Sequence, residues 1–268
     1  MSDASAPYPS RWRPPKLVES PVLRAGLWLL VLIYLVWSFG ALEMDWARVS
    51  QGMGRAGNML ARMVPPDFSR WELLLRGMSE SILIAFAASF VGMLLAIPLG
   101  LAAAHNLAPM PVYLLARLII ALSRTFHEII WAIFFVKIVG FGALAGVLTL
   151  IVASASFISK MLAEDIENMN PGPVEAVRAT GASFAKVLVY AVSPQILPRY
   201  LGVSIYRLDA NLRHSTVVGI VGAGGIGQVL AASFSRYDYD FSLAILLVII
   251  SLVFLGEIFS NWIRKRLR

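Results

Sequence analysis

Long runs of apolar residues without charged side chains are the feature that most limits how this chain can fold. No charged residue occurs within 81–104 or within 138–159, and 241–263 contains only Glu257. A fourth uncharged run covers 25–42. A helix needs about 20 mostly apolar residues to cross a bilayer, and a water-soluble core does not need several such runs. The sequence therefore predicts an all-α, polytopic membrane protein.

The composition supports this class of protein. Hydrophobic residues make up 58% of the chain and charged residues 15%, and the mean hydropathy is +0.73. We predict six membrane helices, at about 24–43, 79–104, 111–138, 141–162, 199–222 and 240–263. The net charge of +7 reflects Lys and Arg that flank membrane helices. The chain has no basic stripe interleaved with aromatic residues, so we expect no nucleic-acid partner. The absence of cysteine excludes disulfides and thiolate metal sites.

Basic clusters at both ends of the chain predict its topology. They comprise Arg11, Arg13, Lys16 and Arg24 before the first predicted span and Arg264, Lys265, Arg266 and Arg268 after the last. An even number of spans places both ends on one side of the membrane, and positive charge marks that side as the cytoplasm. Residues 1–24 are then a cytoplasmic tail, 25–43 form the first span as a retained anchor, and 163–198 form a cytoplasmic loop.

The external segment 44–75 conflicts with that topology because it is rich in arginine. Arg48, Arg55 and Arg62 recur every seven residues, and apolar residues recur at helical spacing on another face. We expect an amphipathic helix that ends before the proline pair at Pro65. This helix lies either in the outer membrane interface or against the protein's own outer surface.

The segment 171–198 is a polar and apolar insert between two predicted spans. Proline after Gly172 suits the first turn of a new helix. Gly181 permits a sharp turn, and Ser183 can cap a second short helix. The insert therefore predicts two short helices that form a compact knob, with an ordinary surface loop as the alternative.

Four residues of this insert resemble a known motif. Glu175, Ala176, Gly181 and Pro194 are similar to the cytoplasmic EAA loop of ABC importer permeases, although Val177 departs from the consensus. In that family the loop fits a groove on the ATP-hydrolysing subunit. The resemblance therefore implies that these four residues couple the chain to an ATPase.

A glycine cluster follows the fifth predicted span. It contains Gly222, Gly224, Gly225 and Gly227. The spacing matches the G-x-G-x-x-G dinucleotide pattern, but that motif needs a βαβ unit and an acidic ribose partner, so we reject this interpretation. Importers of the methionine and phosphonate kinds have a similar VGAGGIG sequence, and the resemblance implies an irregular outer turn near a gate.

Ionisable residues occur inside two predicted spans, where such groups are costly and usually face a cavity or each other. Near the span ends, Arg117 and Lys137 can reach the membrane interfaces. Arg207 and Asp209 are poorly spaced to pair on one helix, so we expect a partner on another helix. The mid-span residues are Arg124, His127, Glu128, Arg213 and His214. Their charge is cationic on balance, and they either line a pathway for an oxyanion or form internal salt bridges.

Two enzymatic interpretations fail on the sequence. His127 and Glu128 lack the H-E-x-x-H continuation because Trp131 stands at the second His position. The chain also has no G-x-x-x-x-G-K-[ST] phosphate loop. We therefore expect no catalytic residues, no metal and no cofactor in this chain, and any ATP that drives transport must bind another subunit.

The stretches 135–148 and 206–230 extend the resemblance over roughly 75–268. The chain is most similar to the permeases of phosphonate- and phosphite-type ABC importers, which implies a type I importer fold over 76–264. The family usually has Ser-Ile-Pro between Arg124 and Glu128, where this chain has Thr-Phe-His. The ligand implied is a phosphonate, phosphite or hypophosphite.

The same resemblance implies partners and a location. They are a second copy of this chain, two cytoplasmic ATPase subunits that hold ATP and Mg, and an extracytoplasmic solute-binding protein. The location is the bacterial inner membrane. An ABC permease for another small solute remains an alternative, as does a secondary transporter, which works without an ATPase and usually carries internal repeats.

Overall fold

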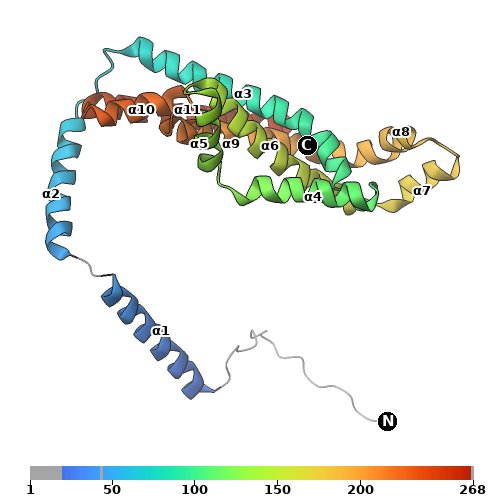
Figure 1. Ribbon diagram of the computed structural model, residues 1–268, viewed down its shortest axis with the longest axis horizontal. Helices are drawn as coiled ribbons and strands as arrows, with labels where there is room; N and C mark the ends of the chain where they lie inside the picture. Colours follow the sequence, from blue (N-terminus) through green and yellow to red (C-terminus); the bar gives the residue numbers. More distant parts are fainter. Residues whose placement is uncertain (1–19, 43–44, 267–268) are drawn as a thin grey trace, which may run out of the picture. The chain divides into compact units, whose positions relative to one another are not determined.

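A computed structural model describes residues 20–42 and 45–266 of the chain (Figure 1). Every regular element in this described part is a helix, which confirms the all-α class. The chain divides into two compact units, residues 1–58 and residues 59–268. Four members of the predicted basic clusters, Arg11, Arg13, Lys16 and Arg268, lie outside the described residues.

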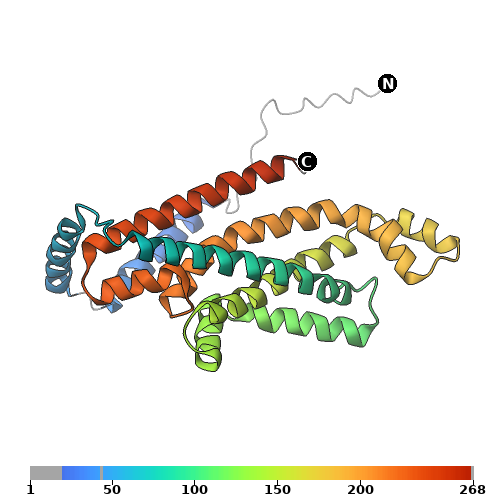
Figure 2. The same cartoon turned by 90° about the horizontal axis from the view of Figure 1, so that it is seen from above.

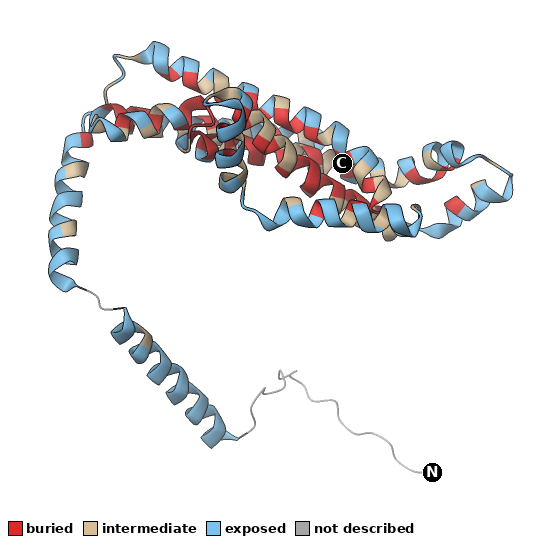
Figure 3. Ribbon diagram, viewed as in Figure 1, coloured by how far each residue is buried: buried red, intermediate tan, exposed pale blue. Residues whose placement is uncertain are grey.

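The first unit contains α1 (Pro21–Ala41), which matches the first predicted span. The Oγ of Ser20 caps this helix by accepting a hydrogen bond from the Leu23 backbone N–H at 3.4 Å. Large apolar side chains are exposed along its length, including Trp28 and Trp37 (Figure 3). A helix of 21 residues with such a surface suits a lipid environment.

The helix α2 (Trp46–Met63) has the predicted amphipathic character. Asp45 lies before its first turn and accepts a hydrogen bond from the Arg48 backbone N–H at 3.1 Å. The helix ends at Met63, just before the proline pair at Pro65, as predicted. Proline lacks the N–H that a further helical turn requires, which explains this end.

The second unit is a helical bundle built around a long parallel pair. The helices α3 (Trp71–Ala102) and α6 (Ala143–Glu167) lie side by side along much of their length (Figure 2). Both also contact α9 (Ser193–Ile220), and α10 (Gly225–Ser235) packs on α3 and α9. The last helix, α11 (Tyr239–Arg266), packs on α9 and α10.

Small residues let α3 approach α6 closely. A Cβ at Gly92 would lie 2.6 Å from the Cβ of Ser154, and a Cβ at Gly100 would lie 2.7 Å from the Cδ2 of Leu162. Ala96, halfway between the two glycines, is fully buried. This small-xxx-small stripe replaces bulky side chains with backbone contact, which is how helices associate inside membranes.

Five helices are long and apolar enough to cross a membrane, and a sixth span is possible if one bent helix pair is counted as a unit. The prediction of one straight helix at 111–138 is wrong. The structure has α4 (Met110–Thr125) and α5 (Glu128–Val139), which meet at an angle of 93°. The residues between them, Phe126 and His127, are extended.

Two further differences concern the second half of the chain. Residues 163–167 and 193–198, expected in the loop, continue the helices α6 and α9. Between them lie α7 (Pro171–Ala179), α8 (Phe184–Val187) and the π-helix η1 (Leu188–Val192). The glycine turn is followed by α10, a separate helix that the six-span prediction did not include.

The α3–α6 contact predicts a specific sensitivity to side-chain volume. Gly92→Val should destabilise the detergent-solubilised protein by about 1–3 kcal/mol, because overpacking forces neighbouring backbone apart. Gly202→Val is the matched control, since it also lies in a helix but a Cβ there would meet nothing within 4 Å. Thermal unfolding followed by fluorescence measures both variants, and equal losses would contradict the close approach.

Candidate functional site

The bend between α4 and α5 places a carboxylate at the start of a helix in the middle of the bundle. His127 is the N-cap of α5, and its Nδ1 accepts a hydrogen bond from the Ile129 backbone N–H at 3.3 Å. Glu128 follows in the first turn. Across the bend, the Nε1 of Trp131 donates to the backbone carbonyl of Ser123 at 3.1 Å. The cap and this hydrogen bond together fix the position of Glu128.

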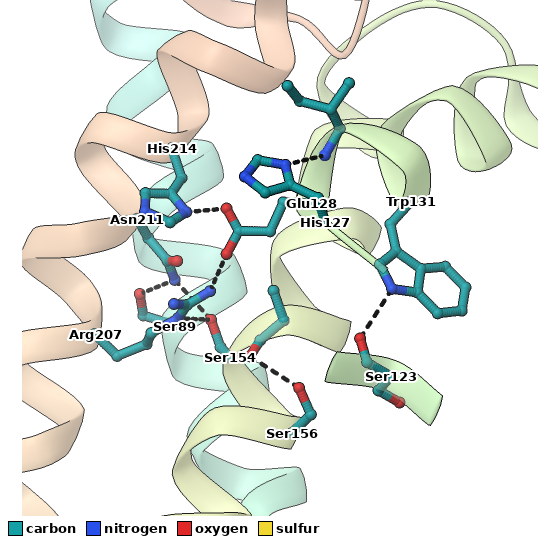
Figure 4. Close-up of polar contacts among 12 residues, drawn as sticks. Ser89, Ser123, His127, Glu128, Trp131, Ser154, Ser156, Arg207, Asn211 and His214 are labelled. Atoms are coloured by element: carbon teal, nitrogen blue, oxygen red, sulfur yellow. Dashed lines mark hydrogen bonds and ion pairs between the residues drawn. The ribbon is translucent and has the colours of Figure 1, made fainter. Parts of the chain in front are cut away.

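Glu128 binds two basic side chains of α9 (Figure 4). Its Oε1 accepts a hydrogen bond from the Arg207 Nη2 at 2.7 Å, and its Oε2 contacts the Nδ1 of His214. The Arg207 side chain is 8% exposed and the Glu128 side chain 17% exposed. The ion pair therefore satisfies charges that are almost removed from solvent. Such pairs need good geometry and further hydrogen bonds to offset desolvation.

Those further hydrogen bonds come from two more helices. The Nε of Arg207 donates to the Ser154 Oγ of α6 at 3.2 Å. The Nδ2 of Asn211 donates to the same Ser154 Oγ and to the Ser89 Oγ of α3, both at 2.8 Å. The network therefore joins α3, α5, α6 and α9. Its α9 members share one helical face, because they are spaced by four and three residues.

Arg124, one of the two arginines of the predicted mid-span set, lies close to this network. Its guanidinium carbon is 5.5 Å from the ring centroid of Phe157, and the guanidinium carbon of Arg207 lies at the same distance from the same ring. A cation near an aromatic face is attracted by the ring quadrupole. Among the described residues Arg124 has no ion-pair partner, and its side chain is exposed.

Arg213 occupies a separate position on α9. It forms an ion pair with Asp209 at 2.9 Å, one turn earlier on the same helix. The structure therefore brings together Glu128, His214 and Arg207, places Arg124 beside them, and leaves Arg213 in its own pair. The predicted partner of Arg207 on another helix is confirmed as Glu128, whereas Asp209 pairs within its own helix.

The sequence interpretation missed three polar residues of the network, Ser89, Ser154 and Asn211. Serine and asparagine inside apolar runs are common and carry no charge signal. The one available signal was helical spacing, since Asn211 stands between Arg207 and His214 on one face of α9.

A second polar contact group ties the α3–α4 connection to the end of α6. The Nη2 of Arg117 donates to both carboxylate oxygens of Glu167, at 2.8 and 2.9 Å. The Nε of Arg117 donates to the Ala103 carbonyl at 2.9 Å. The Nε and Nη2 groups of Arg117 therefore both have hydrogen-bond partners at helix ends. This position is consistent with the predicted place of Arg117 near a membrane interface.

The glycine turn joins α9 to α10 inside the bundle. Gly222, Gly224 and Gly225 all have positive φ, at 93°, 81° and 72°, a region that side chains disfavour. A Cβ at Gly224 would lie 2.6 Å from the Ala143 backbone nitrogen. The last glycine, Gly227, packs against the Thr216 carbonyl. The predicted irregular turn is confirmed, and these four residues are buried.

The insert forms the predicted knob of two short helices. Gly181 joins α7 to α8 with φ of 74°. Val174 and Val187 anchor the knob in the core, whereas Glu175 and Ala176 are exposed. Ser183 stands at the predicted N-cap position of α8 without a side-chain capping hydrogen bond, and Pro194 lies in the first turn of α9. Glu175, Ala176, Gly181 and Pro194 are all exposed.

The described residues contain no group of three or more His, Asp or Glu side chains that could hold a metal ion. A bent helix pair, a buried polar network across four helices and an exposed knob are the main features of this multi-pass helical bundle. Residues 96–268 match the family described as "binding-protein-dependent transport system inner membrane component", and the chain belongs to this family. The protein is therefore a multi-pass inner-membrane protein.

Two relatives and one solved structure extend this result. A phosphite transport system permease protein of Stutzerimonas stutzeri is 38% identical over 239 residues, which are 89% of this chain and 86% of that protein. A phosphate-import permease protein of Mycolicibacterium smegmatis is 36% identical over 261 residues. These residues are 97% of this chain and 48% of that relative, so this chain spans about half of its length. The fold resembles an inward-facing MetNI methionine ABC transporter with a TM-score of 0.65 and 25% identity, over 75% of this chain and 99% of that one.

The Glu128–Arg207 pair predicts a large energetic coupling. Arg207→Met should destabilise the protein by about 3–5 kcal/mol, because it leaves a buried carboxylate without its guanidinium. The double variant Glu128→Met/Arg207→Met should recover most of that loss. Arg178→Met, at an exposed position on α7, is the control and should change stability by less than about 0.5 kcal/mol. Additive losses in a double-mutant cycle would show that the pair is not coupled.

Proposed function

We propose that this chain is the permease subunit of an ABC importer that carries a small phosphorus oxyanion inward. The family membership supports a transport role. Relatives whose names give phosphite and phosphate as cargo support the oxyanion class. Phosphonate and hypophosphite are also tetrahedral phosphorus anions, so they belong to the same candidate class.

One observation carries the proposal: the polar network has more cationic than anionic groups. Arg124 and Arg207 stand against the single carboxylate of Glu128, and Glu128 is bonded to Arg207 and His214. Arg124 is therefore the cation whose charge is free to act on a ligand. An anion in a low-dielectric passage is attracted strongly by such a group.

The five predicted pathway residues take different parts in this proposal. Glu128 anchors the bend and lowers the positive charge, so that an anion is held weakly enough to be released. Arg124 attracts the anion, and the exposed His127 and half-buried His214 offer polar contacts beside it. Arg213 lies on α9, as His214 does, and its side chain is 40% exposed. It is a further cation, although Asp209 offsets its charge.

The proposed partners follow the same logic. We propose a homodimer of this chain, two cytoplasmic ATPase subunits that bind ATP and Mg, and an extracytoplasmic solute-binding protein. Both termini and the loop within 163–198 then face the cytoplasm, and residues 44–75 face outward. Glu175, Ala176, Gly181 and Pro194 contact the ATPase, while the buried glycine turn gives α9 and α10 a bend close to the outer gate.

Arg124 is the direct test of the transport proposal. In vesicles that contain the permease, its ATPase and its binding protein, Arg124→Gln should reduce ATP-driven phosphite uptake about tenfold, which corresponds to ~1.4 kcal/mol. Arg55→Gln, an exposed arginine on α2, should leave uptake unchanged. Normal uptake by Arg124→Gln would remove this residue from the pathway. Uptake in ATP-depleted vesicles with an ion gradient would instead indicate a secondary transporter.

Gly181 tests the coupling role of the knob through backbone geometry alone. A Cβ at this position meets nothing within 4 Å, so volume is not limiting, but φ is 74°. Gly181→Val should therefore reduce ligand-stimulated ATP hydrolysis several-fold, because a β-branched residue disfavours this φ. Gly181→Asn is the control, since asparagine tolerates it. Equal hydrolysis by both variants would contradict a coupling role for this turn.

A further inference from the structure

A basic cleft is lined by residues of α3, α10 and the start of α11. In the ribbon, α10 and the start of α11 lie at the end of the second unit that is remote from α7 and α8 (Figure 2). The volume of the cleft is about 340 Å³. The start of α3, the length of α10 and the start of α11 form its walls. Its charged and amide side chains are Arg70, Arg76, Glu80, Gln228, Arg236 and Asp238.

One of the three arginines is already satisfied by the protein. The Nη1 of Arg70 binds the Asp238 carboxylate at 3.1 Å, and its guanidinium lies 3.7 Å from the ring centroid of Phe241. A second carboxylate, Asp67, lies 3.9 Å from its Nη2. Arg70 therefore forms a fixed wall of the cleft and holds α3 against α11.

The other two arginines have no such partners. Among the described residues, the side chains of Arg76 and Arg236 form no hydrogen bond or ion pair, and both are exposed. Arg76 belongs to α3 and Arg236 is the C-cap residue of α10, and both line the cleft. The only other carboxylate in that lining is Glu80, which is half-buried. Two free guanidinium groups against one carboxylate leave the cleft with a net positive charge.

This set of groups suits one kind of anion. A guanidinium donates two parallel N–H groups, which match the oxygens of a phosphate-like ion. Two guanidinium groups on opposite walls require an ion with at least three oxygens. Near neutral pH a share of such ions is monoprotonated, and the P–OH group of that form donates a hydrogen bond that suits Glu80 or the Gln228 carbonyl as acceptor. A carboxylate or a halide has too few oxygens to use both arginines and the acceptors together.

We propose that this cleft is a second, weak binding site for a monoprotonated phosphorus oxyanion, held by Arg76 and Arg236 at the mouth of the permease. The site rests on the proposed function, since that function supplies the cargo. It lies at the opposite end of the bundle from the knob, where cargo enters before it reaches Arg124. Exposed ion pairs are individually weak, so we expect half-saturation on the order of 1 mM.

Binding to the purified permease without its partners tests this site. We would measure the ³¹P line width of phosphite in the presence of the permease in lipid nanodiscs. The double variant Arg76→Gln/Arg236→Gln should weaken phosphite binding at least tenfold, and each single variant about threefold. Arg76→Lys/Arg236→Lys should lose part of the affinity, because it keeps the charge and loses the forked donors. Arg55→Gln should bind as the wild type does.

Three results would overturn the proposal. The first is unchanged phosphite binding by the double variant with an unchanged thermal midpoint. The second is equal competition by acetate, which would show unselective charge attraction. The third is unchanged phosphite binding together with weaker association of the solute-binding protein, which would make the cleft a protein-docking surface. A failure of the proposed function appears elsewhere, as absent ATP-driven uptake in the full complex while phosphite still binds the cleft.

Discussion

The ion pair between Glu128 and Arg207 is the interaction on which the interior of the bundle depends. It joins α5, which begins after a 93° bend, to α9, the helix that contacts most of the others. Without Arg207, the carboxylate would face an apolar interior with only His214 beside it. Arg207 and Asn211 of α9 both donate to Ser154 of α6, and Asn211 also donates to Ser89 of α3, so the network joins four helices.

The same helix connects this network to the knob. α9 follows η1 directly and spans 28 residues, a length of about 42 Å. The knob is anchored by Val187 in front of η1, and Arg207 lies in the middle of α9. A π-helical turn often marks a functional position because it widens a helix locally. The knob and the residues that hold the bend at Glu128 are therefore joined by one continuous helical segment.

The sequence predicted the parts of this fold that depend on local pattern. Apolar runs with at most one charge located α1, α3, α6 and α11, and seven-residue spacing of arginines located α2. α9 was predicted as a span that carries ionisable residues. Glycine and proline positions located the knob, and the family resemblance located the irregular turn at Gly222. The bend at His127 was missed because apolar periodicity continues on both sides of it, although the polar residues from Ser123 to Glu128 were a local signal.

Pairing across the bundle could not be predicted in the same way. Whether Arg124 or Arg207 forms the ion pair with Glu128 depends on how the helices pack against one another. The residue pattern within one helix does not contain that information. The stripe at Gly92 and Gly100 was also missed, because small residues in an apolar run have no distinct periodic charge. The phosphate-like cargo followed from the family resemblance and not from any single residue.

The central claim is that Arg124 faces a passage for anions beside a fixed ion pair. Because the chain has no cysteine, Thr125→Cys introduces a single thiol at an exposed position next to Arg124. The account predicts that this thiol, in the assembled transporter, reacts faster with an anionic methanethiosulfonate than with a cationic one of similar size. Adding Arg124→Gln should abolish that preference. An unreactive thiol, or a preference that survives the removal of Arg124, would contradict the account.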